Sequence, residues 1–265
     1  MKTKVYRTKK KPKMANSKCK SKTRIVGIIP ARYDSTRFPG KVLVDIYGKS
    51  MLQWVYERSK KAKSLDYLAI ATDDKRIKEE AEKFGAQVIM TSRKNKTGTE
   101  RVAEAIDAIQ CDIVLNIQAD EPLIPFRGIN KLCLIMLQNE NLQVATLAST
   151  VSFDDPLVEN SDTAKIILDK NDFALYFSRL PIPFSRQNIP HPFLIHIGIY
   201  AFRKAFLPKL ISFKKSRLEE MEKLEQLRIL DNGYKIKVVK TKYQTVSVDV
   251  PKDLERARKL FVSIK

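Results

Sequence analysis

Hydrophobic runs alternate with amphipathic stretches through the first half of the chain. Four apolar runs are typical of buried strands, and three stretches between them have apolar residues at helical spacing: the strands cover residues 24–29, 67–71, 86–91 and 112–118, and the helices cover 50–63, 73–85 and 99–109. Gly85 suits the end of the second helix, and Thr99 is a candidate N-cap of the third. This order predicts a parallel, doubly wound α/β sheet with right-handed crossovers.

The second half of the chain is less regular. Five further apolar runs predict strands, which we expect to join the same sheet as antiparallel additions: 144–149, 164–168, 174–178, 194–202 and 235–239. A long helix is predicted over 217–230, and a last helix follows Pro251, because proline suits a first helical turn. No internal repeat or flexible linker interrupts residues 25–265, so we expect one α/β domain there.

Composition agrees with this interpretation. The 265 residues are 43% hydrophobic, which is enough to bury the core of one large α/β domain. The three cysteines, Cys19, Cys111 and Cys133, form no CxxC pair, and no apolar run approaches the roughly 20 residues that cross a membrane. We therefore expect a soluble protein of the reducing cytoplasm, without a disulfide framework, a zinc site or a membrane span.

The net charge of +20 is unevenly distributed. Residues 1–24 contain eleven Lys or Arg and no acid, which leaves +9 for the other 241 residues. We expect residues 1–24 to form a disordered basic extension, because they contain too few apolar groups to offset their ordering entropy. That extension is either a solvated tail, with Met14 as another start, or an arm that binds polyanions. Nucleic acid is disfavoured as the primary partner, since more than half of the excess charge belongs to the tail.

A basic loop follows the first predicted strand. In the sequence IPARYDSTRFPGK, Arg32, Arg37 and Lys41 lie at the carboxyl end of that strand, where ligands bind in such folds. Three cations with Gly40, which permits close backbone approach, suit a triphosphate. Neither a Walker A sequence nor GxGxxG is present. From the residues alone, the loop is either a phosphate-binding element or a solvated basic loop.

The loop resembles the first signature of the sugar-nucleotide-forming cytidylyltransferases, in details similar to the 3-deoxy-manno-octulosonate (Kdo) cytidylyltransferase family. Further blocks similar to that family follow in its order: ATDD (71–74), TGTERVAE (97–104), NIQADEPLIP (116–125), ATLAS (145–149), ALYFSRLPIP (174–183), HIGIYAF (196–202), LEQLRIL (224–230) and VDVPKDLERAR (248–258). The resemblance covers about residues 25–262. It implies transfer of CMP from CTP to the anomeric hydroxyl of Kdo, with release of pyrophosphate, for lipopolysaccharide biosynthesis.

The resemblance also implies a role for each matching residue. The triphosphate would be bound by Arg32, Ser35, Thr36, Arg37 and Lys41, and cytosine would be selected around Ala31, Thr97, Gly98 and Thr99. The acidic sugar would contact Gln118, Arg179, His196, Tyr200, Glu225 and Gln226. The catalytic set would be Arg32, Arg37, Lys41, Asp120 and Asp249. Without the resemblance, His196 and Tyr200 would be read as core residues that share one face of a strand.

Two distant carboxylates are the candidate metal ligands. Asp120 and Asp249 each follow an apolar run, so both can reach the carboxyl edge of the sheet and share one cation. Their hard oxygens favour Mg²⁺ as the cofactor. The resemblance implies a supporting role for the adjacent Glu121, which we do not expect to bind the metal. Taken singly, Asp120 would be a loop acid and Asp249 an acid near a helix N-terminus.

Four positions depart from the family pattern. Ala119 replaces a usual glycine and would be strained by about 1–2 kcal/mol if its φ were positive. Ser247 stands where a glycine before Val248 and Asp249 is usual, Val250 replaces a common threonine, and Thr97 replaces a usual serine. An amino analogue of Kdo or another 2-keto sugar acid is an alternative acceptor, sialic acid fits less well, and a non-catalytic CTP-binding descendant is a further alternative. The resemblance implies a homodimer, to which Phe184 or Phe193 could contribute.

Overall fold

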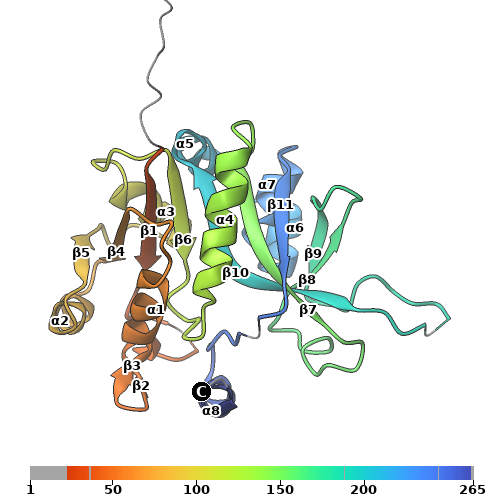
Figure 1. The fold of residues 1–265 in the computed structure, drawn as a ribbon, viewed down its shortest axis with the longest axis horizontal. Coiled ribbons are helices and arrows are strands. Elements are labelled where there is room, and N and C mark those ends of the chain that lie inside the picture. The colour runs from red at the N-terminus through yellow and green to blue at the C-terminus, as the bar shows by residue number, and fades with distance from the viewer. Residues whose placement is uncertain (1–22, 36, 188, 244, 264–265) are drawn as a thin grey trace, which may run out of the picture.

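The computed structural model describes residues 23–35, 37–187, 189–243 and 245–263. Most of the predicted basic extension, Cys19 and Thr36 therefore lie outside the described residues. Within the described part, a nine-stranded sheet forms the centre of the molecule (Figure 1), in the order β11-β7-β10-β6-β1-β4-β5, with β8 attached to β10 and β9 attached to β8. Its strands are β1 (Ile25–Pro30), β4 (Tyr67–Thr72), β5 (Gln87–Met90), β6 (Ile113–Ile117), β7 (Val144–Val151), β8 (Lys165–Leu168), β9 (Ala174–Ser178), β10 (Phe193–Arg203) and β11 (Ile236–Thr241). A separate hairpin is formed by β2 (Asp45–Ile46) and β3 (Lys49–Ser50).

The first half of the sheet is parallel, as predicted. Strand β1 pairs in parallel with β4 and β6, and β4 pairs in parallel with β5. Strand β10 is antiparallel to β6 and β7, which confirms the antiparallel additions. Strand β11 differs from the prediction because it runs parallel to β7. Strand β10 ends and β11 begins at the edge where β7 starts, since Phe202 and Ile236 both pair with Val144, so β11 runs in the direction of β7.

Helices cover both faces of the sheet. They are α1 (Met51–Lys60), α2 (Lys75–Lys83), α3 (Gly98–Ala105), α4 (Phe126–Gln138), α5 (Leu207–Ser212), α6 (Arg217–Glu222), α7 (Leu227–Asp231) and α8 (Pro251–Ser263), with short 3₁₀ turns η1 (Lys41–Leu43) and η2 (Lys204–Phe206). One apolar core contains residues of α1, α2, α4 and α8, and the other contains residues of α3, α5 and α7. Ile29 of β1 joins the first core and Ile28 the second. Both faces are buried, which explains the continuous apolar run in β1.

Most predicted helices begin and end close to their predicted bounds. Ser50 caps α1 by accepting a hydrogen bond from the Gln53 N–H at 3.3 Å, and Gly85 follows α2 with a φ of 71°. The prediction of Thr99 as an N-cap was wrong. Helix α3 begins earlier, and Thr97 caps it by accepting a hydrogen bond from the Glu100 N–H at 3.1 Å.

Two helical segments were misjudged from the sequence. The predicted helix over 217–230 is two short helices, because Lys223 ends α6 with a left-handed φ of 54°. Helix α4 was not predicted, although Ile129, Leu132 and Met136 have helical spacing and are fully buried. Among the described residues, none of these helices combines the length and apolar character needed to cross a membrane.

Candidate active site

The loop after β1 carries the basic residues to the carboxyl edge of the sheet. The Ala31 N–H donates to the Ala71 carbonyl at 2.8 Å, which extends the β1–β4 pairing by one step. Gly40 has a φ of 69°, and its N–H donates to the Tyr33 carbonyl at 2.9 Å. A β-carbon at Gly40 would lie 3.1 Å from the Tyr33 ring, so this turn needs glycine for both conformation and space. The turn starts η1 and places Lys41 at the sheet edge.

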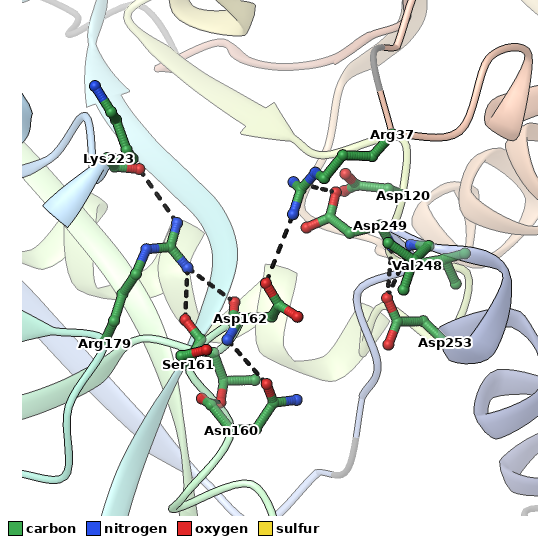
Figure 2. Close-up of polar contacts among 12 residues, drawn as sticks. Arg37, Asp120, Asn160, Ser161, Asp162, Arg179, Lys223, Val248, Asp249 and Asp253 are labelled. Carbon is green, nitrogen blue, oxygen red and sulfur yellow. Dashed lines mark hydrogen bonds and ion pairs between the residues drawn. The ribbon is translucent and has the colours of Figure 1, made fainter.

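Lys41 lies between the two predicted metal ligands. Its ammonium group contacts Asp120 Oδ2 at 2.7 Å, Asp249 Oδ1 at 2.9 Å and the Val248 carbonyl at 3.0 Å. Arg37 contacts the same Asp249 oxygen at 3.0 Å (Figure 2). The first basic loop and two carboxylates distant in sequence therefore form one ion cluster.

The two carboxylates are held by contacts of their own segments. Asp120 follows β6, and its carbonyl accepts a hydrogen bond from the Val248 N–H at 2.9 Å. The N–H groups of Asp249 and Val250 both donate to Asp253 Oδ2 at 3.0 Å, in the first turn of α8. This cap fixes the chain entering α8, and it leaves the Asp249 side chain directed at Lys41 and Arg37.

The cluster shifts the pKa of its members. Burial disfavours the charged form of Lys41, but the negative charges of Asp120 and Asp249 outweigh burial and raise its pKa. Burial likewise opposes the charge of Asp249, yet Lys41 and Arg37 hold the pKa of this carboxyl below its usual value. Lys41 is therefore charged and Asp249 ionised at neutral pH.

A polar cavity of about 240 Å³ opens beside this cluster. Ten predicted site residues line it: Ala31, Arg32, Ser35, Arg37, Lys41, Thr97, Gly98, Gln118, Asp120 and Asp249. Gln118, which was expected at the sugar, thus lines the same cavity as the residues expected at CTP. Ala119 lines the same cavity and is absent from the residues with positive φ, so the strain considered for it does not arise.

Three polar residues of this cavity were not singled out from the sequence: Asn95, Lys96 and Arg101. Arg101 is 4% exposed, and its guanidinium pairs with Asp73 at 3.0 Å. Both lie in sequence blocks that were recognised, ATDD and TGTERVAE. The available signal was the position of Arg101 on the sheet side of a short helix that begins at Gly98. An arginine in a helix is more often solvated, so this signal was not used.

A second cavity of about 550 Å³ adjoins the first, and Asp249 lines both. Its wall includes Glu121, Ser149 and His196. Burial lowers the pKa of His196 to about 3, and its Nε2 lies 2.9 Å from the Thr146 hydroxyl, so the ring is neutral at pH 7. The His196 and Tyr200 rings lie side by side with centroids 5.2 Å apart, which confirms their shared face.

The remaining predicted sugar residues do not line either of these two cavities: Arg179, Tyr200, Glu225 and Gln226. Thr99 Oγ1 donates to Glu225 Oε2 at 3.1 Å. Arg179 donates to the carbonyls of Ser161, Asp162 and Lys223 and to that of Glu222 (Figure 2). The Tyr200 hydroxyl and the Gln226 amide nitrogen are buried without a hydrogen-bond partner among the described residues. Buried polar atoms are normally hydrogen-bonded, so these two atoms are candidates to pair with a bound ligand.

The carboxylate pair has the chemistry of a magnesium site. Asp120 and Asp249 already converge on one cation, the Lys41 ammonium, and they offer the hard oxygens that Mg²⁺ prefers. Across the described chain, no group of three or more His, Cys, Asp or Glu gathers in a way that suits a metal. Magnesium is commonly bound by one or two carboxylates with substrate phosphates and water, so the pair fits it.

Fold and site together define a class of protein. A doubly wound sheet whose carboxyl edge collects a basic loop, two carboxylates and a small polar cavity is typical of α/β enzymes that act on phosphorylated nucleotides. The sequence profile of the cytidylyltransferases matches residues 26–236. A 3-deoxy-manno-octulosonate cytidylyltransferase of Thermodesulfovibrio yellowstonii is 45% identical over 246 residues, which cover 88% of this chain and 96% of that protein. One of Fusobacterium nucleatum is 44% identical over 234 residues, covering 88% and 95%.

Solved structures agree with these sequence relatives. A CMP:2-keto-3-deoxy-manno-octonic acid synthetase complexed with CTP superposes with a TM-score of 0.85 at 37% identity, over 92% of this chain and 100% of that one. A cytidylyltransferase of Leptospira borgpetersenii has a TM-score of 0.62 at 18% identity, over 91% of this chain and 87% of that one, and shows the shared fold alone. The chain therefore belongs to the cytidylyltransferase family, and within it to the 3-deoxy-manno-octulosonate cytidylyltransferases.

Proposed function

We propose that this chain transfers CMP from CTP to the anomeric hydroxyl of Kdo, giving CMP-Kdo and pyrophosphate for lipopolysaccharide biosynthesis. The observation that carries this proposal is the ion cluster of Lys41, Arg37, Asp120 and Asp249 at the wall between the two cavities. The smaller cavity takes the nucleotide and the larger one the sugar acid. The reacting groups then meet beside Asp249, the residue common to both.

The reaction needs charge neutralisation more than covalent catalysis. The anomeric oxygen forms a bond to the α-phosphorus, the bond from that phosphorus to the pyrophosphate oxygen breaks, and the hydroxyl proton passes to solvent. Arg32, Arg37 and Lys41 would stabilise the phosphate oxygens, since their cations line the cavity. To do this, Lys41 and Arg37 would replace their contacts to carboxylate oxygens with contacts to phosphate oxygens.

Asp120 and Asp249 would hold Mg²⁺ in this proposal. When bound, the metal would neutralise phosphate charge and lower the pKa of the attacking hydroxyl. The base would be selected at the other end of the small cavity, beside Ala31 and Gly98. A β-carbon on Gly98 would lie 3.3 Å from Pro30 Cγ, so there is little room for a side chain there.

The test is pyrophosphate release by the purified protein with Mg²⁺, CTP and Kdo, with each omitted in turn and with the four nucleotides compared. We expect release only when all three are present and CTP is the nucleotide. Asp120→Asn and Asp249→Asn should each lower the rate by about 100-fold or more, because each removes a carboxylate ligand of the metal that would neutralise the phosphate charge. Asp172→Asn is the matched control, since Asp172 pairs with Lys240 on the surface and should leave the rate unchanged.

The outcome also decides between acceptors. CTP binding with no release from Kdo, but release from an amino analogue of Kdo, would replace the acceptor and keep the reaction type. CTP binding without release from any 2-keto sugar acid would contradict the enzyme and favour a nucleotide-binding descendant.

We further propose a cytoplasmic homodimer. Cys111 and Cys133 are free thiols, which suits a reducing compartment. The segment between β9 and β10 reaches away from the body of the molecule (Figure 1), and it exposes Leu180 by 70% and Phe184 by 86%. Such apolar side chains on a projecting segment suit a protein contact. Phe193 is buried at 4% and belongs to the interior.

The dimer is tested by light scattering on a size-exclusion column. Phe184→Ser should shift the mass toward the monomer if the projecting segment forms the interface. Val262→Ser, at another exposed apolar position, should not. A monomeric wild-type protein at micromolar concentration would contradict the homodimer.

A further inference from the structure

Glu121 is a buried carboxyl that the proposed reaction does not use. It follows Asp120 directly, and its side chain is 3% exposed. Oε1 accepts a hydrogen bond from the Gly198 N–H, and Oε2 accepts one from the Thr245 hydroxyl at 3.3 Å. Neither partner is charged, and in the described chain no lysine or arginine forms an ion pair with it. The two hydrogen bonds satisfy one oxygen each of this buried carboxyl and fix its position.

The two donors come from segments that also carry site residues. Gly198 lies in β10 between His196 and Tyr200, where the pairing of β10 with β7 shifts register. Thr245 lies four residues before Asp249 on the segment that enters α8. The Glu121 carboxyl therefore connects the loop that carries Asp120 to strand β10 and to the segment that carries Asp249.

The fit around Glu121 is tight. A β-carbon at Gly198 would lie 2.6 Å from Glu121 Oε1, closer than a carbon and an oxygen can approach, so this carboxyl position requires glycine in β10. Gly198 does not have a positive φ, which means that space, and not backbone conformation, explains the glycine. The backbone contact from the Val248 N–H to the Asp120 carbonyl, at 2.9 Å, lies beside this connection and joins the same two segments.

Glutamine has the same shape as glutamate and can take its place between these two donors. Glutamine keeps an acceptor for the Gly198 N–H and offers an N–H to the Thr245 hydroxyl.

We propose that Glu121 is a positioning residue that holds Asp120 and Asp249 at the spacing at which their carboxylates share one cation. Its own carboxyl contacts Gly198 and Thr245 and acts through the backbone of the two segments. The inference rests on the proposed function, because it assigns Asp120 and Asp249 to the metal.

The test compares Glu121→Gln with Glu121→Ala. Two quantities are measured: the Mg²⁺ concentration that half-saturates pyrophosphate release, and the Mg²⁺ concentration that half-saturates the rise in melting temperature with CTP present and Kdo absent. We expect Glu121→Ala to raise both by about 10-fold or more, the usual effect of losing an outer partner of a metal ligand, with a smaller change in the rate at saturating Mg²⁺. Glu121→Gln should stay within about threefold of the wild type.

Two further variants keep the test decisive. Thr245→Val removes one donor and should shift both concentrations in the same direction by a smaller factor, and it replaces Glu121→Ala if that variant does not fold. Leu210→Ala, buried in α5 at the other core, should lower the melting temperature without changing the Mg²⁺ requirement.

An unchanged Mg²⁺ requirement in Glu121→Ala, or in Thr245→Val where it stands in, would overturn the inference. So would a Glu121→Gln variant as impaired as Glu121→Ala. These results differ from a failure of the proposed function, in which the wild-type protein itself releases no pyrophosphate from CTP and Kdo. The melting-temperature measurement needs no turnover, so it tests the positioning role in either case.

Discussion

Replacement of Lys41 by methionine should convert the ion cluster into a site that depends on metal for its stability. The ammonium contacts Asp120 at 2.7 Å and Asp249 at 2.9 Å, so the two carboxylate oxygens are at most about 5.6 Å apart. Methionine has nearly the same length but no charge. In Lys41→Met the two carboxylates face each other, and Arg37 neutralises only Asp249.

The magnitude follows from that geometry. Two like charges about 5.6 Å apart repel by about 3 kcal/mol at an effective dielectric constant of 20. The carboxylates are 23% and 24% exposed, so solvent and Arg37 reduce this cost, and we expect a loss of about 2 kcal/mol in the free energy of unfolding at pH 7. In a chain of this size, that loss lowers the melting temperature by about 4–8 °C.

The assay is thermal unfolding in EDTA and in increasing Mg²⁺. Without metal the variant should melt below the wild type, and Mg²⁺ should raise its melting temperature more than that of the wild type, because no ammonium competes for the two carboxylates. Pyrophosphate release should fall strongly even at saturating Mg²⁺, since the cation for the phosphates is lost. Lys49→Met is the matched control, because Lys49 pairs with Glu57 at 2.6 Å on the surface and should change stability by less than about 1 kcal/mol without a response to Mg²⁺.

Either of two results would refute this reasoning. A variant as stable as the wild type in EDTA would mean that the carboxylates do not face each other when the ammonium is removed. An equal rise of both melting temperatures with Mg²⁺ would mean that Lys41 does not occupy the position of the metal.

Three further predictions concern other parts of the structure. The pKa of His196 falls from 6.5 to about 3 on folding, so only the unfolded chain takes up this proton as the pH drops below 6.5. The difference in unfolding free energy between wild type and His196→Gln, measured by urea unfolding, should therefore shrink by about 2 kcal/mol between pH 7 and pH 5. A difference that stays constant over this pH range would contradict the prediction. Arg228→Met leaves the buried Glu219 carboxylate without its partner and should lower the free energy of unfolding by about 3–5 kcal/mol. The double variant Glu219→Gln with Arg228→Met should lose less stability, and equal losses would rule out a buried charge as the cause. Gly98→Val narrows the small cavity beside Pro30 and should raise the KM for CTP by about 10-fold or more, with little change in the KM for Kdo. An unchanged KM for CTP would mean that the nucleotide binds elsewhere.

Local patterns account for most of the first half of the fold. The buried strand β1, the capped helix α1 and the glycine that ends α2 depend on neighbours within a few residues, so their periodicity was visible in the sequence. The apolar spacing of helix α4 was also present in the sequence, but it was overlooked. The break at Lys223 was not visible, since a lysine with a left-handed φ has no distinctive sequence pattern.

The candidate site divides in the same way. The basic loop and the carboxylates were found because each belongs to a short recognisable block, and the structure brings Arg32, Arg37, Lys41 and Asp120 to one cavity with Asp249. Arg101 was missed because its partner, Asp73, lies in another block and only the packing of α3 against the sheet buries the pair.

The sequence by itself determined the α/β class, the order of most elements and the residue types of the site, because these depend on local periodicity and on short blocks. Only the tertiary structure decided that Lys41 lies between Asp120 and Asp249, that β11 runs parallel to β7, and that Glu121 connects β10 to the segment before α8. Those contacts join residues 77 to 208 positions apart. Such contacts are selected by the burial of whole faces of the sheet and by the pairing of buried charges, and no local pattern specifies them.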